Sequence, residues 1–132
     1  MKVSIGQDSH RFESEESTKA LVLGGIEIPN CPGLDGNSDA DVVLHAITNA
    51  VSGITGVNIL GKIADDLCKS GVTDSSVYLK EALKYLDPEF TIEHLSISIE
   101  GLRPKFAPHI DAIKKNIARL LGISSRSIGL TA

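Results

Sequence analysis

The sequence contains two kinds of hydrophobic pattern. In some blocks apolar and polar residues alternate, and in others the apolar residues have helical spacing. Residues 2–7 alternate at every second position, which predicts a first strand. Residues 13–19 are polar and charged, as is typical of a surface loop. Leu21–Ile28 predicts a second strand region, in which Gly24-Gly25 indicates a bend or bulge. The first part of the chain is therefore predicted to hold two strands joined by an exposed loop.

The first helix is predicted to follow a loop over residues 30–37, which contains a proline and two glycines. Ser38 and Asp41 have the spacing of a capping box, so Ser38 is predicted to open the helix with Asp41 at its third position. Gly53 and Gly56 indicate where the helix ends. Its apolar stripe consists of Val43, Ala46, Ile47, Ala50, Val51 and Ile54.

A second helix and a third strand are predicted in the middle of the chain. The helix covers Ser75–Leu86, with Thr73 or Asp74 as its cap, and an Asp-Pro pair stops it. Residues 92–99 then predict a strand, because apolar Leu95, Ile97 and Ile99 alternate with polar Ser96, Ser98 and Glu100.

The last elements predicted are a helix and the start of a strand. The helix begins at Pro108, runs to about Leu121 and is capped by Gly122. Residues 128–132 predict the beginning of a strand. This order of elements favours an α+β fold, a sheet with helices packed on one face. We expect one domain over residues 1–132.

Composition and charge narrow the class of protein. The chain has 132 residues, enough for one domain with a real core, and 42% of them are hydrophobic. The net charge is −4 with no basic block, which argues against nucleic-acid binding. There is no apolar run of membrane-span length and no signal-peptide core at residues 1–5. Cys31 and Cys68 lack C-x-x-C spacing and are interpreted as free thiols in a reducing cytoplasm.

Three residues form a candidate metal site. Asp8 and His10 lie two apart at the end of the first predicted strand, so their side chains point to the same side. His45, on the first predicted helix, supplies a third ligand if that helix packs beside the strand. Two histidines and one carboxylate are a common set for catalytic zinc, with a fourth position open. A chance D-x-H pattern, with His45 a core histidine bonded to a backbone carbonyl, remains the alternative reading of these residues.

Other motifs exclude several enzyme classes. The chain contains no G-x-G-x-x-G, no Walker loop and no G-x-S-x-G, which argues against common nucleotide enzymes and serine hydrolases. The basic loop Arg103-Pro104-Lys105 could contact phosphate or face solvent, and the sequence does not decide between them.

Taken together, several blocks resemble the 2-C-methyl-D-erythritol 2,4-cyclodiphosphate synthase family of the non-mevalonate isoprenoid pathway. They run in the family's order along nearly the whole chain, and the D-x-H-R-F and S-D-A-D-x-x-x-H-A blocks are the most specific. The blocks are residues 6–12, 23–29, 38–46, 61–62, 74–75 and 103–110.

The resemblance implies a trimer-forming domain in a ferredoxin-like arrangement, with active sites between subunits of a homotrimer. It implies that Asp8, His10 and His45 hold Zn²⁺ or another divalent metal, and that a second ion such as Mg²⁺ or Mn²⁺ bridges the substrate diphosphate. The substrate would be 4-diphosphocytidyl-2-C-methyl-D-erythritol 2-phosphate. The reaction would be that of a phosphorus-oxygen lyase, in which the 2-phosphate attacks the β-phosphorus and CMP leaves. The location would be the cytoplasm, or a plastid-type organelle for the mature form of a eukaryotic protein.

The resemblance also suggests site residues, with some departures from the family pattern. Asn37 stands where the family has a phosphate-contacting histidine, and the helix opened by Ser38 would offer an anion site, so these two are the candidate catalytic residues. Asn49 and Ile59 stand where the family has aspartates, the second of which holds the ribose. The predicted substrate-binding residues are Asn58, Gly61, Asp66, Arg103, Pro104, Lys105, Phe106 and Ala132. Ala132 falls just before a family segment that contacts the diphosphate, so we expect the C-terminal strand to be missing from this sequence.

Two hypotheses follow from the sequence. The intact metal ligands favour an active cyclodiphosphate synthase. The changes at Asn37, Asn49 and Ile59 favour the alternative, a non-catalytic zinc-binding trimeric relative that binds a nucleotide or isoprenoid ligand.

Overall fold

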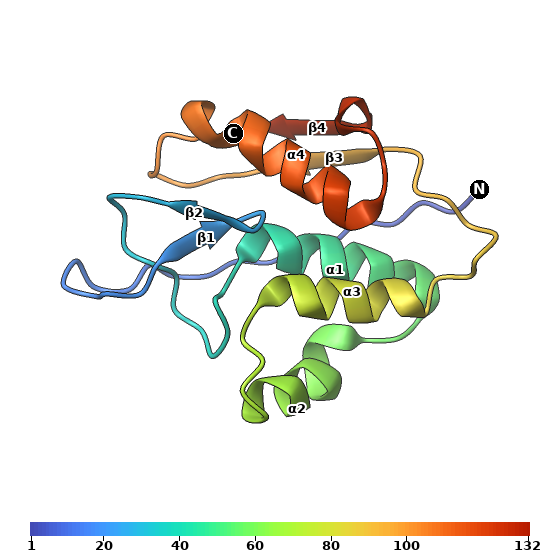
Figure 1. Cartoon of the computed structure of the whole chain (residues 1–132), viewed down its shortest axis with the longest axis horizontal. Coiled ribbons are helices and arrows are strands. Elements are labelled where there is room, and N and C mark those ends of the chain that lie inside the picture. The colour runs from blue at the N-terminus through green and yellow to red at the C-terminus, as the bar shows by residue number, and fades with distance from the viewer.

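Two long helices run side by side through the centre of the molecule, which is described by a computed structural model over residues 1–132. They are α1 (Val42–Thr55) and α3 (Ser75–Lys84) (Figure 1). On one side of this pair lies a unit built from β3 (Leu95–Ser98), α4 (Ile110–Leu121) and β4 (Ile128–Thr131), and on the other side lies the short helix α2 (Ala64–Lys69) (Figure 1). None of the helices is long and apolar enough to cross a membrane.

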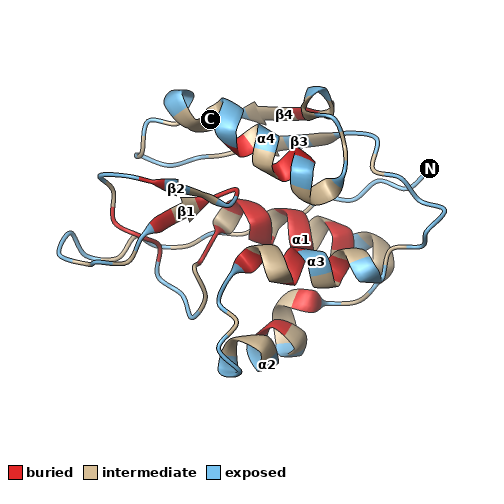
Figure 2. Ribbon diagram, viewed as in Figure 1, coloured by how far each residue is buried: buried red, intermediate tan, exposed pale blue.

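The core lies where α1 meets its neighbours, and it is almost entirely aliphatic. Figure 2 shows buried positions concentrated along α1 and on the sides of α3 and α4 that face it. The apolar stripe predicted for the first helix is largely buried, including Val43, Ile47 and Val51, and α4 contributes Ile113 and Ile117. The helical periodicity therefore identified the packed face of α1 in part: the rest of its predicted stripe is half-buried, and the fully buried Leu44 was not in it.

The strands form two small separate sheets in place of the single sheet that we expected. β1 (Leu21–Leu23) pairs antiparallel with β2 (Ile26–Ile28), and β3 pairs parallel with β4 in the register Leu95↔Ile128. Gly24 and Gly25 both have positive φ, of 61° and 79°, so the predicted bend is a two-residue hairpin turn. The mixture of helices and strands is as predicted, but the arrangement is not one continuous sheet.

The strand predicted over residues 2–7 is absent. Residues 1–11 have no regular structure, and Val3 and Ile5 are 84% and 91% exposed. A strand requires a neighbour for its backbone N–H and C=O groups. Here the segment lies beside α1, whose backbone groups are already used within the helix. An alternating pattern was therefore not sufficient to make a strand.

The predicted cap of the first helix was also wrong. Asp41, not Ser38, is the N-cap of α1, and its carboxylate accepts a hydrogen bond from the Leu44 N–H. Ala40 has a φ of 55°, which takes the preceding residues out of the helix. Ser38 instead accepts a hydrogen bond from the N–H of Ala40. The chain therefore reaches the helix through an irregular turn over residues 38–40.

The remaining helix ends agree more closely with the sequence. Asp74 caps α3, which settles the choice between Thr73 and Asp74, although the helix ends at Lys84 and not at Leu86. Pro108 lies in a 3₁₀ turn that leads into α4, and Gly122 caps α4 with a φ of 67°. The helical turn at Ile59–Ile63 and α2 were not predicted, because they are short.

Asp41 joins the hairpin to α1. Its two carboxylate oxygens accept hydrogen bonds from the N–H groups of Gly24, Gly25 and Leu44 at 2.9, 2.6 and 3.0 Å. Burial raises the pKa of Asp41 to about 6, although these three hydrogen bonds favour the charged form. At neutral pH Asp41 is therefore an ionised, acceptor-only group that holds the turn against the start of the helix.

We expect Asp41→Ala to lower the free energy of unfolding by about 2–4 kcal/mol, measured by urea denaturation. Loss of an N-cap costs about 0.5–2 kcal/mol, and each buried N–H left without a partner costs about 1–3 kcal/mol. Asp74→Ala is the matched control, because Asp74 caps α3 through a single bond to the Ser76 N–H and lies at the surface. Equal destabilisation by both variants would contradict the role of Asp41 in holding the hairpin.

Candidate metal centre

The N-terminal segment is held close to α1 by Gly6. A Cβ atom at this position would lie 1.9 Å from the Ala46 carbonyl oxygen and 2.5 Å from the Ala50 nitrogen, so only glycine fits. Around this point Ser4 donates a hydrogen bond to the Ala50 carbonyl, and the Asn49 amide donates one to the Gln7 carbonyl at 3.1 Å. These contacts place the residues that follow Gly6 directly over α1.

Asp8, His10 and His45 converge as predicted from the sequence. Their potential ligand atoms all lie within 4.8 Å of one another. Asp8 Oδ2 lies 2.9 Å from His10 Nε2 and 3.1 Å from His45 Nδ1. All three side chains are largely buried, with exposures of 23%, 20% and 10% for Asp8, His10 and His45. The extended segment thus contributes two of the candidate ligands, and α1 contributes the third.

The partner of His10 determines which of its ring nitrogens carries the proton. Its Nδ1 lies 2.7 Å from the Asp35 carbonyl oxygen, which can only accept, so Nδ1 carries the proton in the neutral ring. Nε2 is then left with a lone pair. Although Nε2 is close to Asp8 Oδ2, the two do not have hydrogen-bond geometry, and this buried nitrogen has no partner.

In His45 the proton lies on the other ring nitrogen, Nε2. Its Nε2 lies 2.7 Å from Ser75 Oγ, and the Ser75 hydroxyl donates its own proton to Asp39. Ser75 must therefore accept from His45, so that Nε2 carries the proton and Nδ1 has the lone pair. That lone pair faces Asp8.

This arrangement fits a metal ion. Two imidazole lone pairs and an anionic carboxylate oxygen face the same point, which is unfavourable unless a cation lies between them. Burial acts to raise the pKa of Asp8, but the close contacts with His45 and His10 outweigh burial and lower the pKa, so the carboxylate is held in its charged form. A divalent ion bound at this point would satisfy all three groups at once. The three ligands leave room in a tetrahedral shell for a fourth.

A polar cavity of about 430 Å³ opens in front of the three ligands. Three of the predicted substrate or catalytic residues, Asn37, Ser38 and Asn58, line it together with Asp8 and His45. Asn49, Cys68 and Tyr78 also line the cavity. The loop before α1 and the turn before α2 are therefore brought to the metal ligands from distant parts of the sequence.

Gly61 and Asp66, which follow Asn58 in the sequence, do not line this cavity. Gly61 lies within the short helical turn at Ile59–Ile63, where Leu60 and Gly61 depart from helical backbone angles. Asp66 forms an exposed ion pair with Lys62 at 2.8 Å. Both lie next to cavity-lining residues but face elsewhere in this chain.

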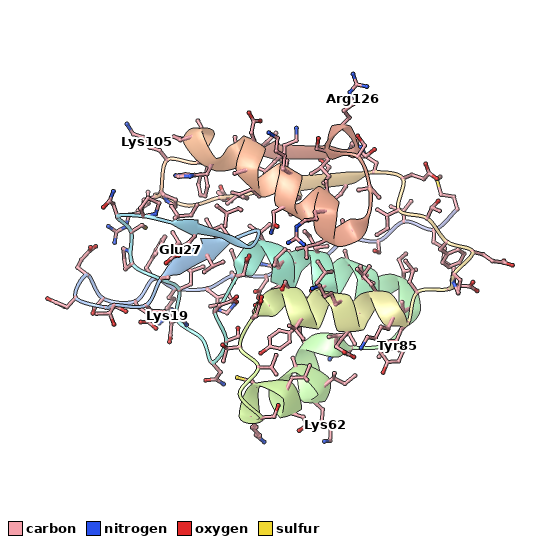
Figure 3. The ribbon with its side chains drawn as sticks, viewed as in Figure 1. Lys19, Glu27, Lys62, Tyr85, Lys105 and Arg126 are labelled. Atoms are coloured by element: carbon pink, nitrogen blue, oxygen red, sulfur yellow. The ribbon has the colours of Figure 1, made fainter.

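The Arg103–Phe106 loop lies on a different side of the ligands. Arg103, Pro104 and Phe106 line a second, more apolar cavity of about 220 Å³, which also borders Asp8 and His10. Arg103 pairs with Glu15 and lies 5.3 Å from the centre of the Phe12 ring. Lys105 extends from the surface (Figure 3), and Ala132 is exposed at the chain end. Within one chain this loop and Asn58 do not share a cavity.

Sequence reasoning missed the residues that support His45. Asp39 lies in the same S-D-A-D block as Asp41, and Ser75 lies at the start of α3, but neither was assigned a role. The signal in the sequence was that both lie in blocks that resemble the family, residues 38–46 and 74–75. Their contact with His45 depends on how α1 and α3 pack.

Comparison with known proteins gives consistent matches. The sequence matches the YgbB family over residues 1–132. It is 52% identical over 132 residues to the 2-C-methyl-D-erythritol 2,4-cyclodiphosphate synthase of Chlamydia felis, covering 99% of this chain and 75% of that protein. It superposes on a solved structure of 2C-methyl-D-erythritol-2,4-cyclodiphosphate synthase with a TM-score of 0.80 and 31% identity, covering 98% of this chain and 86% of the other. A CDP-bound form of such a synthase matches with a TM-score of 0.77 and 28% identity, at the same coverage of 98% and 86%.

Proposed function

The chain belongs to the YgbB family, and from this premise we infer that it is a 2-C-methyl-D-erythritol 2,4-cyclodiphosphate synthase. It cyclises 4-diphosphocytidyl-2-C-methyl-D-erythritol 2-phosphate. An oxygen of the 2-phosphate forms a bond to the β-phosphorus, and the bond between the β-phosphorus and the oxygen that leads to the α-phosphorus breaks. CMP leaves with that oxygen and its electron pair. The observation that carries the metal-assisted mechanism is the convergence of Asp8, His10 and His45 at the mouth of a polar cavity.

The reaction requires no nucleophile from the protein, because the substrate carries its own. The protein has to bring two phosphate groups together and exclude competing attack by water. Holding reacting groups in the correct geometry and stabilising developing charge account for most of the acceleration in such reactions. The polar cavity is suited to this work, because it combines amide side chains with the three metal ligands.

We propose that Asp8 Oδ2, His10 Nε2 and His45 Nδ1 hold Zn²⁺. When bound, the ion would polarise a phosphate oxygen and neutralise its charge. Mg²⁺ or Mn²⁺ bound to the substrate diphosphate would neutralise part of its negative charge. The donor set supports zinc, since imidazole nitrogen and carboxylate oxygen in a three-ligand site are typical of catalytic zinc.

We also propose that Asn37 and Ser38 contact the substrate phosphates and that Asn58 contacts the nucleotide. Asn37 is exposed and lies in the cavity wall with Asp8 and His10. Its amide can donate a hydrogen bond to a phosphate oxygen without carrying charge. The anion site expected at a helix opened by Ser38 is not part of this proposal, because Asp41 caps α1 and its carboxylate occupies that end.

Asn37→Ala is expected to lower kcat/KM by about tenfold or more, because losing a hydrogen bond to a charged group costs about 1.5–3 kcal/mol. The zinc content should not change, since Asn37 is not a ligand. Steady-state kinetics of CMP release, together with metal analysis, would measure both quantities. Asn37→His should be tolerated. Turnover by Asn37→Ala at the parent rate would remove Asn37 from the proposed site.

A homotrimer would explain the position of the Arg103–Phe106 loop. In one chain the loop lies away from Asn58. The loop of a neighbouring subunit would therefore complete the nucleotide-binding site. The exposed apolar side chains of Val3 and Ile5 support burial against another chain. We expect sedimentation equilibrium to give three chains per particle. A stable monomer with full activity would contradict the intersubunit site.

The test of the proposed reaction is product identity. The purified chain, supplied with Zn²⁺ and Mg²⁺, should convert the substrate into CMP and a cyclic diphosphate in equal amounts. ³¹P NMR would measure both products. In water enriched in ¹⁸O, neither product should gain the label at its phosphates, because no water attacks phosphorus. Label in a product would identify hydrolysis in place of cyclisation.

A further inference from the structure

His45 is connected through two further side chains to a carboxylate that does not face the metal site. His45 Nε2 lies 2.7 Å from Ser75 Oγ, and Ser75 Oγ donates to Asp39 Oδ1. Asp39 precedes α1, His45 lies within α1, and Ser75 is the first residue of α3. The connection therefore crosses the junction between the two central helices.

The direction of these hydrogen bonds is determined by Asp39. Its Oδ1 also accepts from the Asp41 N–H at 3.1 Å, and its Oδ2 accepts from the Ser75 N–H at 3.1 Å. An ionised carboxylate can only accept, and here both of its oxygens are already directed at donors. The Ser75 hydroxyl has one proton, which goes to Asp39. Its oxygen must therefore accept from His45.

This direction matters because of which nitrogen of His45 faces Asp8. A neutral imidazole has one protonated and one unprotonated nitrogen, and only the unprotonated one can bind a metal. If Ser75 donated to Nε2 instead, the proton would lie on Nδ1, the atom 3.1 Å from Asp8 Oδ2, and the third ligand would be lost.

We propose that Asp39 and Ser75 are positioning residues that fix the proton of His45 on Nε2 and so keep Nδ1 free to bind the metal. The inference rests on the proposed metal role of His45 and deepens it. Neither residue belongs to the group of candidate ligands or lines the polar cavity. Both are buried at least in part, with Ser75 fully buried, so water does not readily replace them as partners of His45.

The first test uses two variants of the same shape. Ser75→Thr keeps the hydroxyl, whereas Ser75→Val replaces it with a methyl group, so both add similar bulk at the same buried position. Binding of Zn²⁺ to the purified full chain, measured against a chromophoric chelator, should be weaker in Ser75→Val than in Ser75→Thr by about tenfold to a hundredfold, the usual effect of losing the partner of a metal-binding histidine. Equal affinities in the two variants would overturn the proposal.

The second test uses two aspartates that accept hydrogen bonds from backbone N–H groups in the first turn of α3. Asp39→Asn introduces an amide that can donate to Ser75 and so reverse the hydroxyl, which should weaken Zn²⁺ binding. Asp74→Asn removes the same charge beside the same helix, where Asp74 accepts only from the Ser76 N–H, and should leave Zn²⁺ affinity unchanged. The visible spectrum of bound Co²⁺ should change in Asp39→Asn and not in Asp74→Asn. Identical spectra and affinities in these two variants would overturn the proposal.

The melting temperature of the metal-free variants separates positioning from general stability. The proposal predicts that Zn²⁺ affinity differs within each pair by more than any difference in melting temperature explains. Affinity that simply follows melting temperature across all four variants would show a structural role only and overturn the proposal. If the parent chain binds Zn²⁺ and forms the cyclic product while Ser75→Val binds Zn²⁺ equally well, the inference fails and the proposed function stands. A parent chain that binds no Zn²⁺ at all would refute the metal role itself.

Discussion

His45→Ala is expected to remove the bound metal and lower the rate of cyclisation by at least about a thousandfold. His45 is the least exposed of the three ligands and the only one contributed by α1, so its loss leaves Asp8 and His10 as a two-ligand site. A metal that polarises a phosphoryl oxygen stabilises the transition state by several kcal/mol, and each ~1.4 kcal/mol corresponds to tenfold in rate. Metal analysis after dialysis and kinetics of CMP release would measure the two effects.

His94→Ala is the control for this variant. His94 is exposed and lies outside the cavity that contains the metal ligands, so its loss should change neither the metal content nor the rate. Retention of one metal ion per chain in His45→Ala would mean that the site is wrongly placed.

Gly6→Ala is expected to lower kcat/KM by at least about a hundredfold and to weaken metal binding, although Gly6 is not a ligand. A Cβ atom would lie 1.9 Å from the Ala46 carbonyl oxygen, which belongs to a helix backbone and cannot move aside. The N-terminal segment would have to shift away from α1 and carry Asp8 and His10 with it. A misplacement of about 1 Å can cost on the order of a hundredfold in rate.

Gly129→Ala provides the matched control, because its Cβ atom would find only an ordinary contact, 3.8 Å from Ser96 Oγ. Zn²⁺ affinity and kinetics should then be close to those of the parent. The role of Gly6 would be contradicted if Gly6→Ala bound Zn²⁺ and turned over substrate as Gly129→Ala does.

The candidate metal ligands could be predicted from the sequence because each signal is local. Asp8 and His10 share a side when the chain is extended, and His45 follows a helix start that polar residues mark clearly. Their convergence still required packing of α1 beside the N-terminal segment, and the sequence hint for this was Gly6. The same packing makes the segment irregular, which is why the strand predicted at residues 2–7 was wrong.

The support of His45 could not be predicted in the same way. The block Ser38-Asp39-Ala40-Asp41 offers three residues that commonly cap helices, and propensity alone does not choose between them. The choice is made by tertiary contacts. Asp41 is required by the hairpin turn, and Asp39 is required by the start of α3. The positive φ of Ala40 allows both carboxylates to reach their partners, and no local pattern indicates it.

The most direct test of the metal-assisted mechanism is a titration of the metal-free chain with Zn²⁺ at fixed Mg²⁺ and substrate. The rate of CMP release should be negligible without Zn²⁺, should rise linearly with bound Zn²⁺, and should level off at one ion per chain, the number that one three-ligand site can hold. A chain that releases CMP at full rate before Zn²⁺ is added, or that remains inactive with one Zn²⁺ bound, would contradict the role proposed for Asp8, His10 and His45.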